Sequence, residues 1–362
     1  MWLEACSMRT EAVAAVPPQP GAPRDAGIDA ARAIGIVLVV IGHARGCPPW
    51  LSMLLYSFHV PLFFWLAGAV VSEARLFEPA GRTVARLARR LLGPYLFFFT
   101  AAYLYWLATR GIGEKAARWG DRPWWEPLQG LATGQGELLY VDPALWFLPA
   151  LFVTAGTYAA LYRRFSAATI AGGALVFALA WCVFFPDSGS RMPFALDVLP
   201  AALVFYACGH WMYPYLRACG RVPRRVVVLV AAAWLALAFA NGRVDLNQLR
   251  FGEAVLLYFA AAGAGILMVL LLAPYVRSNR LTDWLAASTL LIFASHMVTF
   301  NVLSGLAAVA GWQSARDGFG WALASSVVAI LVCKPLGSLL EAGRQRMLRP
   351  LSRATRASVG AG

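Results

Sequence analysis

Ten long apolar segments divide this chain and decide what it can fold into. They lie near residues 27–44, 51–72, 91–109, 144–162, 167–185, 194–212, 225–240, 252–275, 285–309 and 319–340. A helix needs roughly 20 residues to cross the hydrocarbon core of a bilayer, and most of these segments reach that length. The segments are much longer than a strand of a membrane barrel. The sequence therefore predicts an all-α polytopic membrane protein, a bundle of about ten transmembrane helices.

The composition excludes a soluble globular protein and a disordered one. Of the 362 residues, 60% are hydrophobic and 14% are charged, whereas a soluble domain carries roughly a quarter charged residues. Disorder requires low hydrophobicity, which this chain lacks. A net charge of +13 would suit nucleic acid, but the basic residues are nearly all arginines in short loops between apolar segments. This distribution indicates membrane topology, so we expect no nucleic-acid partner.

Arginines gather in alternate loops, and this pattern predicts both termini on the cytoplasmic side. Inner loops of membrane proteins carry an excess of positive charge, whereas outer loops do not. With the N-terminus inside, balanced pairs such as Arg243 with Asp245 fall in outer loops. The inner loops then hold Arg75, Arg82, Arg86, Arg89, Arg90, Arg163, Arg164, Arg217, Arg221, Arg224, Arg225, Arg277 and Arg280.

One transmembrane domain is expected, over residues 27–341. Residues 1–26 are rich in proline and lack the apolar stretch of a signal peptide, so we expect a flexible cytoplasmic tail. Residues 342–362 are expected to form a basic cytoplasmic tail. Residues 110–142, which are rich in tryptophan and acidic residues, form the one long loop and are expected on the outer side.

The first apolar segment carries Asp29, Arg32 and His43. Arg32 and His43 are eleven residues apart, so in a helix they share a face and lie about 16 Å apart along the axis. Asp29 is three residues before Arg32, a spacing that permits an ion pair. Ionisable residues inside a membrane are costly and are functional candidates by default. The alternative is that Arg32 reaches to the membrane interface and His43 merely ends the helix.

All four histidines of the chain fall in predicted membrane segments. His59 lies in the second segment, two residues before Pro61, which can kink the helix. His296 lies near the middle of the ninth segment, and His210 at the inner end of the sixth. A single membrane histidine usually forms a hydrogen bond between helices, and we assign His210 to that role. The occurrence of all four in spans favours a functional site for the others.

Four arginines precede the third segment: Arg82, Arg86, Arg89 and Arg90. In an α-helix the first three lie on one face. Guanidinium groups on one stripe suit a phosphate-rich ligand, since each binds phosphate in a bidentate way. A cluster that contacts anionic lipid headgroups explains the spacing equally well. The spacings of cysteine and histidine do not fit a metal site, so we expect no metal.

Together these motifs resemble the membrane acyltransferase-3 family. The stretch from Asp29 to His43 is similar to the family's first helix with its Arg-x10-His pattern, and residues 58–68 are similar to its second helix. Arg86 and Arg89 match its RxxR motif. Residues 145–148 and 288–296 resemble later motifs, and the resemblance covers about residues 25–340. The second and fourth helices are most similar to the sugar O-acetylase branch, which includes fucose 4-O-acetylase-like proteins.

The resemblance implies a multi-pass enzyme of the bacterial inner membrane. It implies transfer of an acyl group, usually acetyl from acetyl-CoA, to a hydroxyl of an envelope carbohydrate or glycolipid. Arg82, Arg86, Arg89 and Arg90 would bind the acyl-CoA. His43 would be the general base, while Arg32 and Asp29 would form a structural pair or orient the donor. His59 or His296 would supply an oxyanion donor or hold the acceptor, and Asp142, Trp146 and Asp197 would bind the acceptor.

The residues alone leave two other functions open. Membrane histidines and an Asp–Arg pair also suit a proton-coupled transporter of a small polar or sugar-like solute. No internal repeat is visible where many carriers have one, and this counts against a transporter. A structural membrane subunit would explain the hydrophobicity but not the four histidines.

Overall fold

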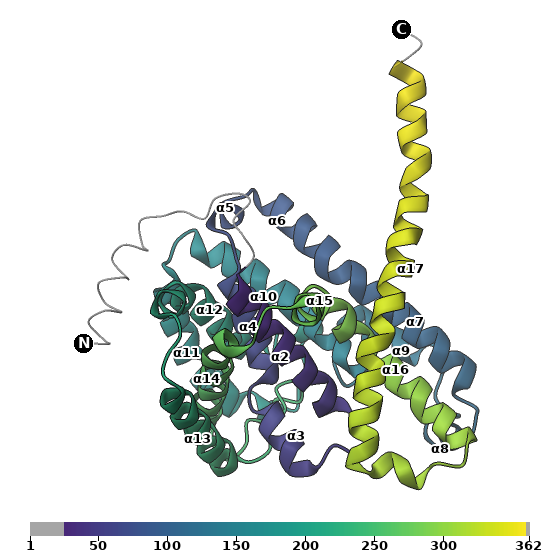
Figure 1. Ribbon diagram of the computed structural model, residues 1–362, viewed down its shortest axis with the longest axis horizontal. Coiled ribbons are helices and arrows are strands. Elements are labelled where there is room, and N and C mark those ends of the chain that lie inside the picture. Colours follow the sequence, from purple (N-terminus) through teal and green to yellow (C-terminus); the bar gives the residue numbers. More distant parts are fainter. Residues whose placement is uncertain (1–24, 360–362) are drawn as a thin grey trace.

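Within the described residues, ten helical segments are long and apolar enough to cross a membrane, which agrees with the predicted number of about ten. The computed structural model describes residues 25–359, with the side chains of residue 187 and residues 343–359 excepted. Every regular element in this range is a helix (Figure 1). The candidate spans are Ala26–His43, Pro49–Ala69, Ala80–Thr109, Pro143–Tyr162, Ala167–Phe184, Pro193–Cys219, Arg224–Asn241, Val255–Tyr275, Thr289–Val309 and Phe319–Ala342.

The spans are built from both long and short helical elements. The main helices are α2 (Ala26–His43), α3 (Pro49–Tyr56), α4 (His59–Ala69), α6 (Ala80–Leu87), α7 (Gly93–Thr109), α10 (Phe147–Tyr162), α11 (Ala167–Phe184), α12 (Leu199–Cys219), α13 (Arg224–Asn241), α14 (Val255–Leu272), α16 (Thr289–Val309) and α17 (Phe319–Val359). Shorter elements are α5 (Glu73–Leu76), η1 (Ala88–Leu92), α8 (Glu114–Trp119), α9 (Glu126–Thr133), η2 (Pro143–Trp146), η3 (Pro186–Ser188), η4 (Pro193–Ala195), η5 (Ala273–Tyr275), α15 (Arg280–Ala287) and η6 (Ser314–Asp317).

Helix α2 is central to the packing of the bundle. It begins at Ala26, and the side chain of the preceding Asp25 accepts hydrogen bonds from the amides of Gly27 and Ile28 and so caps the helix. It packs against α3, α4, α14, α15, α16 and α17. The residues at both ends of α2 therefore contact several helices that are distant in the sequence.

The second span is broken rather than kinked at Pro61. Helix α3 ends at Tyr56, and α4 begins at His59. Pro61 has no amide hydrogen, and its ring clashes with the carbonyl four residues earlier, at Ser57, so the helix cannot continue through that residue. The break makes His59 the first residue of α4.

The third span is a single helix of 30 residues with a π turn inside it. It begins at Ala80, well before the predicted start at residue 91, and passes from α6 through η1 into α7. A π turn holds more residues than an α turn and changes which side chains share a face below and above it. Here it includes Arg89 and Arg90, so the predicted α-helical stripe of arginines does not form unchanged.

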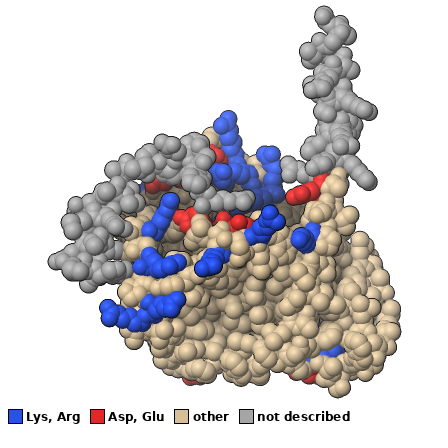
Figure 2. Space-filling model, viewed as in Figure 1, with Lys and Arg blue, Asp and Glu red and all other residues tan. Residues whose placement is uncertain are grey.

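Basic residues concentrate at one end of the bundle. Figure 2 shows most of the visible Lys and Arg side chains along the upper part of the molecule, where α5 and α6 lie. We call this end the arginine-rich face, and the end that carries α3 and α8 the opposite face. The predicted C-terminal tail begins within α17, which is helical to Val359. The predicted N-terminal tail, residues 1–26, lies outside the described residues except for its last two.

The long loop of residues 110–142 folds over the opposite face and contains α8 and α9. The guanidinium of Arg316, which is only 3% exposed, contacts the Glu114 carboxylate at 2.6 Å and donates to the carbonyl of Ser304 at 3.2 Å. This ion pair ties the loop to the segment before α17.

Candidate active site

A cavity of about 340 Å³ opens near the arginine-rich face. Four arginines line it, namely Arg32, Arg75, Arg86 and Arg90. The rest of its wall is mainly apolar, with contributions from α4, α10 and α16. The cavity thus combines several cations with an apolar interior, a combination that suits a ligand with an anionic head and an uncharged arm.

Three phenylalanines form the deep end of this cavity. Along each of α4, α10 and α16, the lining residue farthest from the arginine-rich face is a phenylalanine, namely Phe63, Phe147 and Phe293. The ring of Phe147 contacts both of the others, with centroid distances of 6.4 Å to Phe63 and 5.3 Å to Phe293. We call these three rings the phenylalanine wall.

Behind the wall, the structure brings His43, His59 and His296 together. The ring centroid of His43 lies 5.7 Å from that of His59 and 5.3 Å from that of His296. His59 precedes Phe63 by four residues, and His296 follows Phe293 by three, so each lies about one helical turn beyond its phenylalanine. These three predicted site residues therefore form one cluster, which we call the histidine cluster.

The hydrogen bonds of the histidine cluster fix the positions of its protons. In each ring Nδ1 contacts a backbone carbonyl oxygen of its own segment, at 2.8 Å for His43, 2.6 Å for His59 and 2.6 Å for His296. A carbonyl only accepts, so in the neutral ring the proton is on Nδ1 and Nε2 carries a lone pair. The Nε2 atoms of His59 and His296 are buried and have no hydrogen-bond partner among the described residues.

This tautomer argues against one of the two predicted roles of His59 and His296. An oxyanion donor needs an N–H at the free nitrogen, and the neutral rings present a lone pair there. The geometry instead favours holding a group that donates a hydrogen bond, such as a hydroxyl. His43 differs from both because its side chain is half-buried, whereas His59 and His296 are 1% and 0% exposed.

Two neighbours of the histidine cluster were not predicted from the sequence. The ring of Tyr56 lies 5.5 Å from His43 and 4.8 Å from His59. Asp245, in the loop between α13 and α14, lies close enough for its charge to act on His43 and Tyr56. Burial raises the pKa of the Asp245 carboxyl, while the proximity of His43 opposes that rise. In the sequence Asp245 looked like one half of a balanced outer-loop pair with Arg243, and no motif marked it.

The arginines before the third span are divided by the π turn. Arg86 and Arg90 line the cavity, whereas Arg82 and Arg89 are absent from its wall in the described chain. Arg86 also donates to Glu78 at 3.1 Å, and Arg89 donates to the carbonyl of Ala85 at 3.3 Å. Arg86 and Arg90 are four residues apart and share a face with or without the π turn, whereas the wider turn moves Arg89 away from that face. The sequence contains no signal for the π turn, so it did not separate Arg89 from Arg86 and Arg90.

The predicted ion pair of the first helix is present, with 3.4 Å between Arg32 Nη1 and Asp29 Oδ1. Arg32 lines the cavity, whereas His43, on the same helix, lies behind the phenylalanine wall. His210 accepts or donates a 2.6 Å hydrogen bond with the hydroxyl of Tyr158, between α12 and α10. This is the structural role that we assigned to it.

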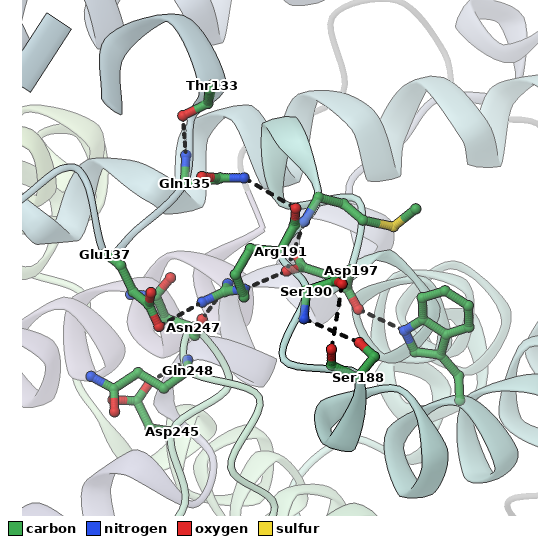
Figure 3. A network of polar contacts seen from close by, with 12 residues as sticks. Thr133, Gln135, Glu137, Ser188, Ser190, Arg191, Asp197, Asp245, Asn247 and Gln248 are labelled. Atoms are coloured by element: carbon green, nitrogen blue, oxygen red, sulfur yellow. Dashed lines mark hydrogen bonds and ion pairs between the residues drawn. The ribbon is translucent and has the colours of Figure 1, made fainter. Parts of the chain in front are cut away.

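The three predicted acceptor-binding residues are scattered. Asp197 is fully buried and contacts the Nε of Arg191 at 2.6 Å, within a network that joins three loops (Figure 3). Asp142 is also fully buried, and neither carboxylate oxygen has a partner among the described residues. Trp146 is 6% exposed and packs against Phe147 of the wall. Within residues 25–359, no group of three or more His, Cys, Asp or Glu side chains is arranged to hold a metal ion.

Comparison with known families decides the class of the protein. A family model described as an acyltransferase domain matches residues 25–336, a range that contains both the cavity and the histidine cluster. The chain belongs to the acyltransferase-3 family. This acyltransferase is therefore a multi-pass membrane enzyme, and family membership favours acyl transfer over the transporter and structural-subunit alternatives. No match was found among curated proteins or among solved structures.

Proposed function

We propose that this acyltransferase moves an acetyl group from acetyl-CoA to a hydroxyl of an envelope carbohydrate or glycolipid, as a sugar O-acetylase of the bacterial inner membrane. One observation carries the proposal. A cavity lined by arginines ends at an apolar wall, and beyond that wall the rings of His59 and His296 lie within 6 Å of the ring of His43, each with a buried Nε2 that has no partner among the described residues. A phosphate-bearing donor and a hydroxyl-bearing acceptor would meet across this wall.

The cavity suits the donor in both charge and shape. Guanidinium groups bind phosphate oxygens through paired hydrogen bonds, and four of them line the cavity. The apolar lining from α4, α10 and α16 suits the slender, uncharged arm that joins the phosphates of CoA to its thioester. Loops rich in arginine remain on the cytoplasmic side of a membrane, which is the side that supplies acyl-CoA.

His43 is the proposed general base because it is the accessible member of the histidine cluster. Its Nε2 lone pair takes the proton of the acceptor hydroxyl as the hydroxyl oxygen attacks the thioester carbonyl carbon. The carbon–sulfur bond then breaks, the new ester forms, and the imidazolium returns its proton to the departing thiolate of CoA. His59 and His296 offer further lone pairs that hold the acceptor hydroxyl in place.

Asp245 supports approach of the acceptor from the opposite face. A carboxylate near His43 stabilises the imidazolium that forms when the hydroxyl proton is taken. It also offers an acceptor for other sugar hydroxyls. Asp197 already pairs with Arg191, and Trp146 packs into the wall, so Asp245 is the better candidate for the acceptor side.

The test is mass spectrometry of envelope glycans from a strain that lacks this protein and expresses either wild type or His43→Ala. We expect an alkali-labile acetyl increment on one glycan with wild type, and a loss of about 100- to 10,000-fold with His43→Ala. His210→Ala is the matched control, because it removes a histidine that bonds Tyr158 away from the cluster. Protein abundance in the membrane is measured for each variant.

Two results would contradict the proposal in different ways. If the wild type adds no acyl group to any envelope glycan, the carbohydrate acceptor is wrong. If acetylation persists with His43→Ala at matched abundance, the assignment of the base is wrong.

A further inference from the structure

The phenylalanine wall lies between the donor cavity and the histidine cluster, so an acyl group that moves from the cavity toward His43 meets these rings. The rings of Phe293 and His296 lie 6.0 Å apart, so the wall and the cluster are in direct contact. The rings of Phe147 and Phe293 are as close as ordinary packed aromatic pairs. The space between them is therefore small and apolar.

One member of the wall is held against the backbone of α2. A Cβ atom added at Gly35 would lie 3.2 and 3.3 Å from two ring carbons of Phe63, which is closer than most packed contacts. The ring of Phe63 thus fits against a helix surface that has no side chain at this position. With Phe147 on its other side, Phe63 has little freedom to move away and widen the passage.

The charges near the wall disfavour an acyl group that carries a carboxylate. Arg32 is the cavity arginine on the same helix as His43, but eleven residues place it about 16 Å away along the axis. Asp245, the charged residue whose field acts on His43, is negative. The charge of Arg243, which acts on Tyr56, also acts on Asp245, so these two opposite charges offset each other near the cluster. A second carboxylate brought to this space would lose its hydration without gaining an uncompensated cation, and such burial is strongly unfavourable.

We propose that Phe63, Phe147 and Phe293 determine acyl selectivity, so that the enzyme accepts acetyl and rejects longer acyl groups and dicarboxylic ones such as succinyl. This inference rests on the proposed function and names the residues that select which acyl-CoA the enzyme uses as donor. Additional methylene groups need space that the three rings occupy. The rejection of succinyl has a separate origin, the lack of an uncompensated cation beside the histidine cluster among the described residues.

The experiment is a competition in inverted membrane vesicles that contain the endogenous acceptor. Acetyl-, propionyl-, butyryl- and succinyl-CoA are supplied together at equal concentrations, and the acyl groups on the glycans are counted by mass spectrometry. For the wild type we expect acetyl to exceed propionyl by about 10- to 200-fold, the range that one methylene gives in an apolar pocket. Succinyl should be undetectable.

Removing a ring from the wall should open space and weaken the selection for short acyl groups. We expect Phe293→Ala and Phe63→Ala to lower the acetyl-to-propionyl ratio by about tenfold or more, and succinyl to remain undetectable. Phe293→Leu and Phe63→Leu are smaller changes that serve if an alanine variant does not fold. Phe205→Ala is the matched control, since Phe205 is a buried phenylalanine of α12 that packs against Phe259 and does not line the cavity in the described chain.

The outcomes separate this inference from the function on which it rests. Absence of transfer from every acyl-CoA by the wild type would contradict the proposed function itself. Transfer with an unchanged ratio in folded Phe63 and Phe293 variants would overturn the role of the wall alone. Transfer of succinyl by the wild type would overturn the charge argument, and an equal change in Phe205→Ala would show that the effect is not specific to the wall.

Discussion

The two faces of this acyltransferase use arginine in opposite ways. On the arginine-rich face, Arg75 and Arg90 line the cavity and are exposed, and the guanidinium of neither forms a hydrogen bond or ion pair with another described residue. On the opposite face, Arg191 is 16% exposed and contacts Asp197 at 2.6 Å, Glu137 at 3.2 Å and the carbonyl of Asn247 at 2.7 Å (Figure 3).

This difference shows that the partners of an arginine, rather than its residue type, indicate its role. Of the five N–H donors of a guanidinium, three are satisfied in Arg191 by two carboxylates and one carbonyl, which come from three loops. That arrangement stabilises the fold and leaves little capacity for a ligand. The guanidinium donors of Arg75 and Arg90 have no such partners among the described residues, so they suit a ligand whose anionic oxygens match them.

The largest effect is expected from a variant that breaks the hydrogen-bond and ion-pair network of the opposite face. Arg191→Ala leaves the fully buried Asp197 without its cation, and we expect the free energy of unfolding to fall by about 3–5 kcal/mol. Denaturant unfolding of the purified protein in detergent, followed by tryptophan fluorescence, measures it. Adding Asp197→Asn to this variant should recover part of the loss, because a neutral amide is less costly to bury.

An exposed arginine on the same loop system provides the matched control for Arg191. Arg122 pairs with Glu126 at 3.1 Å, and its side chain is 48% exposed. We expect Arg122→Ala to change the free energy of unfolding by no more than about 1 kcal/mol. Equal destabilisation by the two variants would show that the burial of Asp197 does not increase the contribution of Arg191 to stability.

The next effect tests whether the arginines that line the cavity bind acetyl-CoA, and whether those of the same helix that point elsewhere do not. We expect Arg86→Ala and Arg90→Ala each to raise the KM for acetyl-CoA by about tenfold or more, since a hydrogen bond to a charged group contributes about 1.5–3 kcal/mol. Arg82→Ala and Arg89→Ala remove the same charge outside the cavity and should leave KM near that of the wild type. The KM is measured in inverted vesicles from initial rates of CoA release.

This set of four variants also sharpens the contrast with Arg191. None of them should change the free energy of unfolding by more than about 0.5 kcal/mol, as is usual for surface positions. If all four variants raise the KM equally, the binding of acetyl-CoA depends on the overall charge of this face rather than on the arginines that line the cavity.

The last expected effect is a dependence on pH rather than a fixed loss, and it concerns a buried carboxyl that has no arginine beside it among the described residues. Burial raises the pKa of Asp142 well above its usual range. The unfolded chain therefore releases this proton at lower pH than the folded protein does. Above about pH 4, stability should fall with rising pH by up to about 1.4 kcal/mol per unit, until the folded-state pKa is passed.

Asp142→Asn should remove this slope, so the variant gains stability relative to wild type as the pH rises from about 4 toward 7. Denaturant unfolding of both proteins at several pH values measures the difference. A constant difference across that range would mean that the carboxyl titrates as it does in the unfolded chain.

Several features were predictable because they depend on local sequence. Ten spans follow from the lengths of the apolar segments, and helices were the expected structure because a backbone inside lipid must satisfy its hydrogen bonds internally. The Asp29–Arg32 pair follows from a spacing of three residues within one helix. The interhelical role of His210 followed from the usual behaviour of a single membrane histidine, although its partner Tyr158 did not.

Other features depend on how helices meet, and the sequence contains no simple signal for them. The chain order shows that His43, His59 and His296 lie in three spans, but only packing brings their rings within 6 Å of His43. Asp245 was missed because a loop of the opposite face folds toward the histidine cluster. The sequence predicted a kink at Pro61, but the helix is interrupted before His59, because the ring of Pro61 clashes with the carbonyl four residues earlier, at Ser57.

The sequence by itself thus determined that this protein is a helical membrane protein with a basic face and histidines in its spans, because hydropathy and charge act on each segment separately. The tertiary structure alone decided which arginines line a cavity, which carboxylates are paired and what lies between the donor cavity and the histidine cluster. Those properties arise from contacts between α2, α4, α10 and α16, which are far apart in the chain. Such contacts depend on the shapes of facing side chains and on local changes of helix register, so they are established only when the bundle is packed.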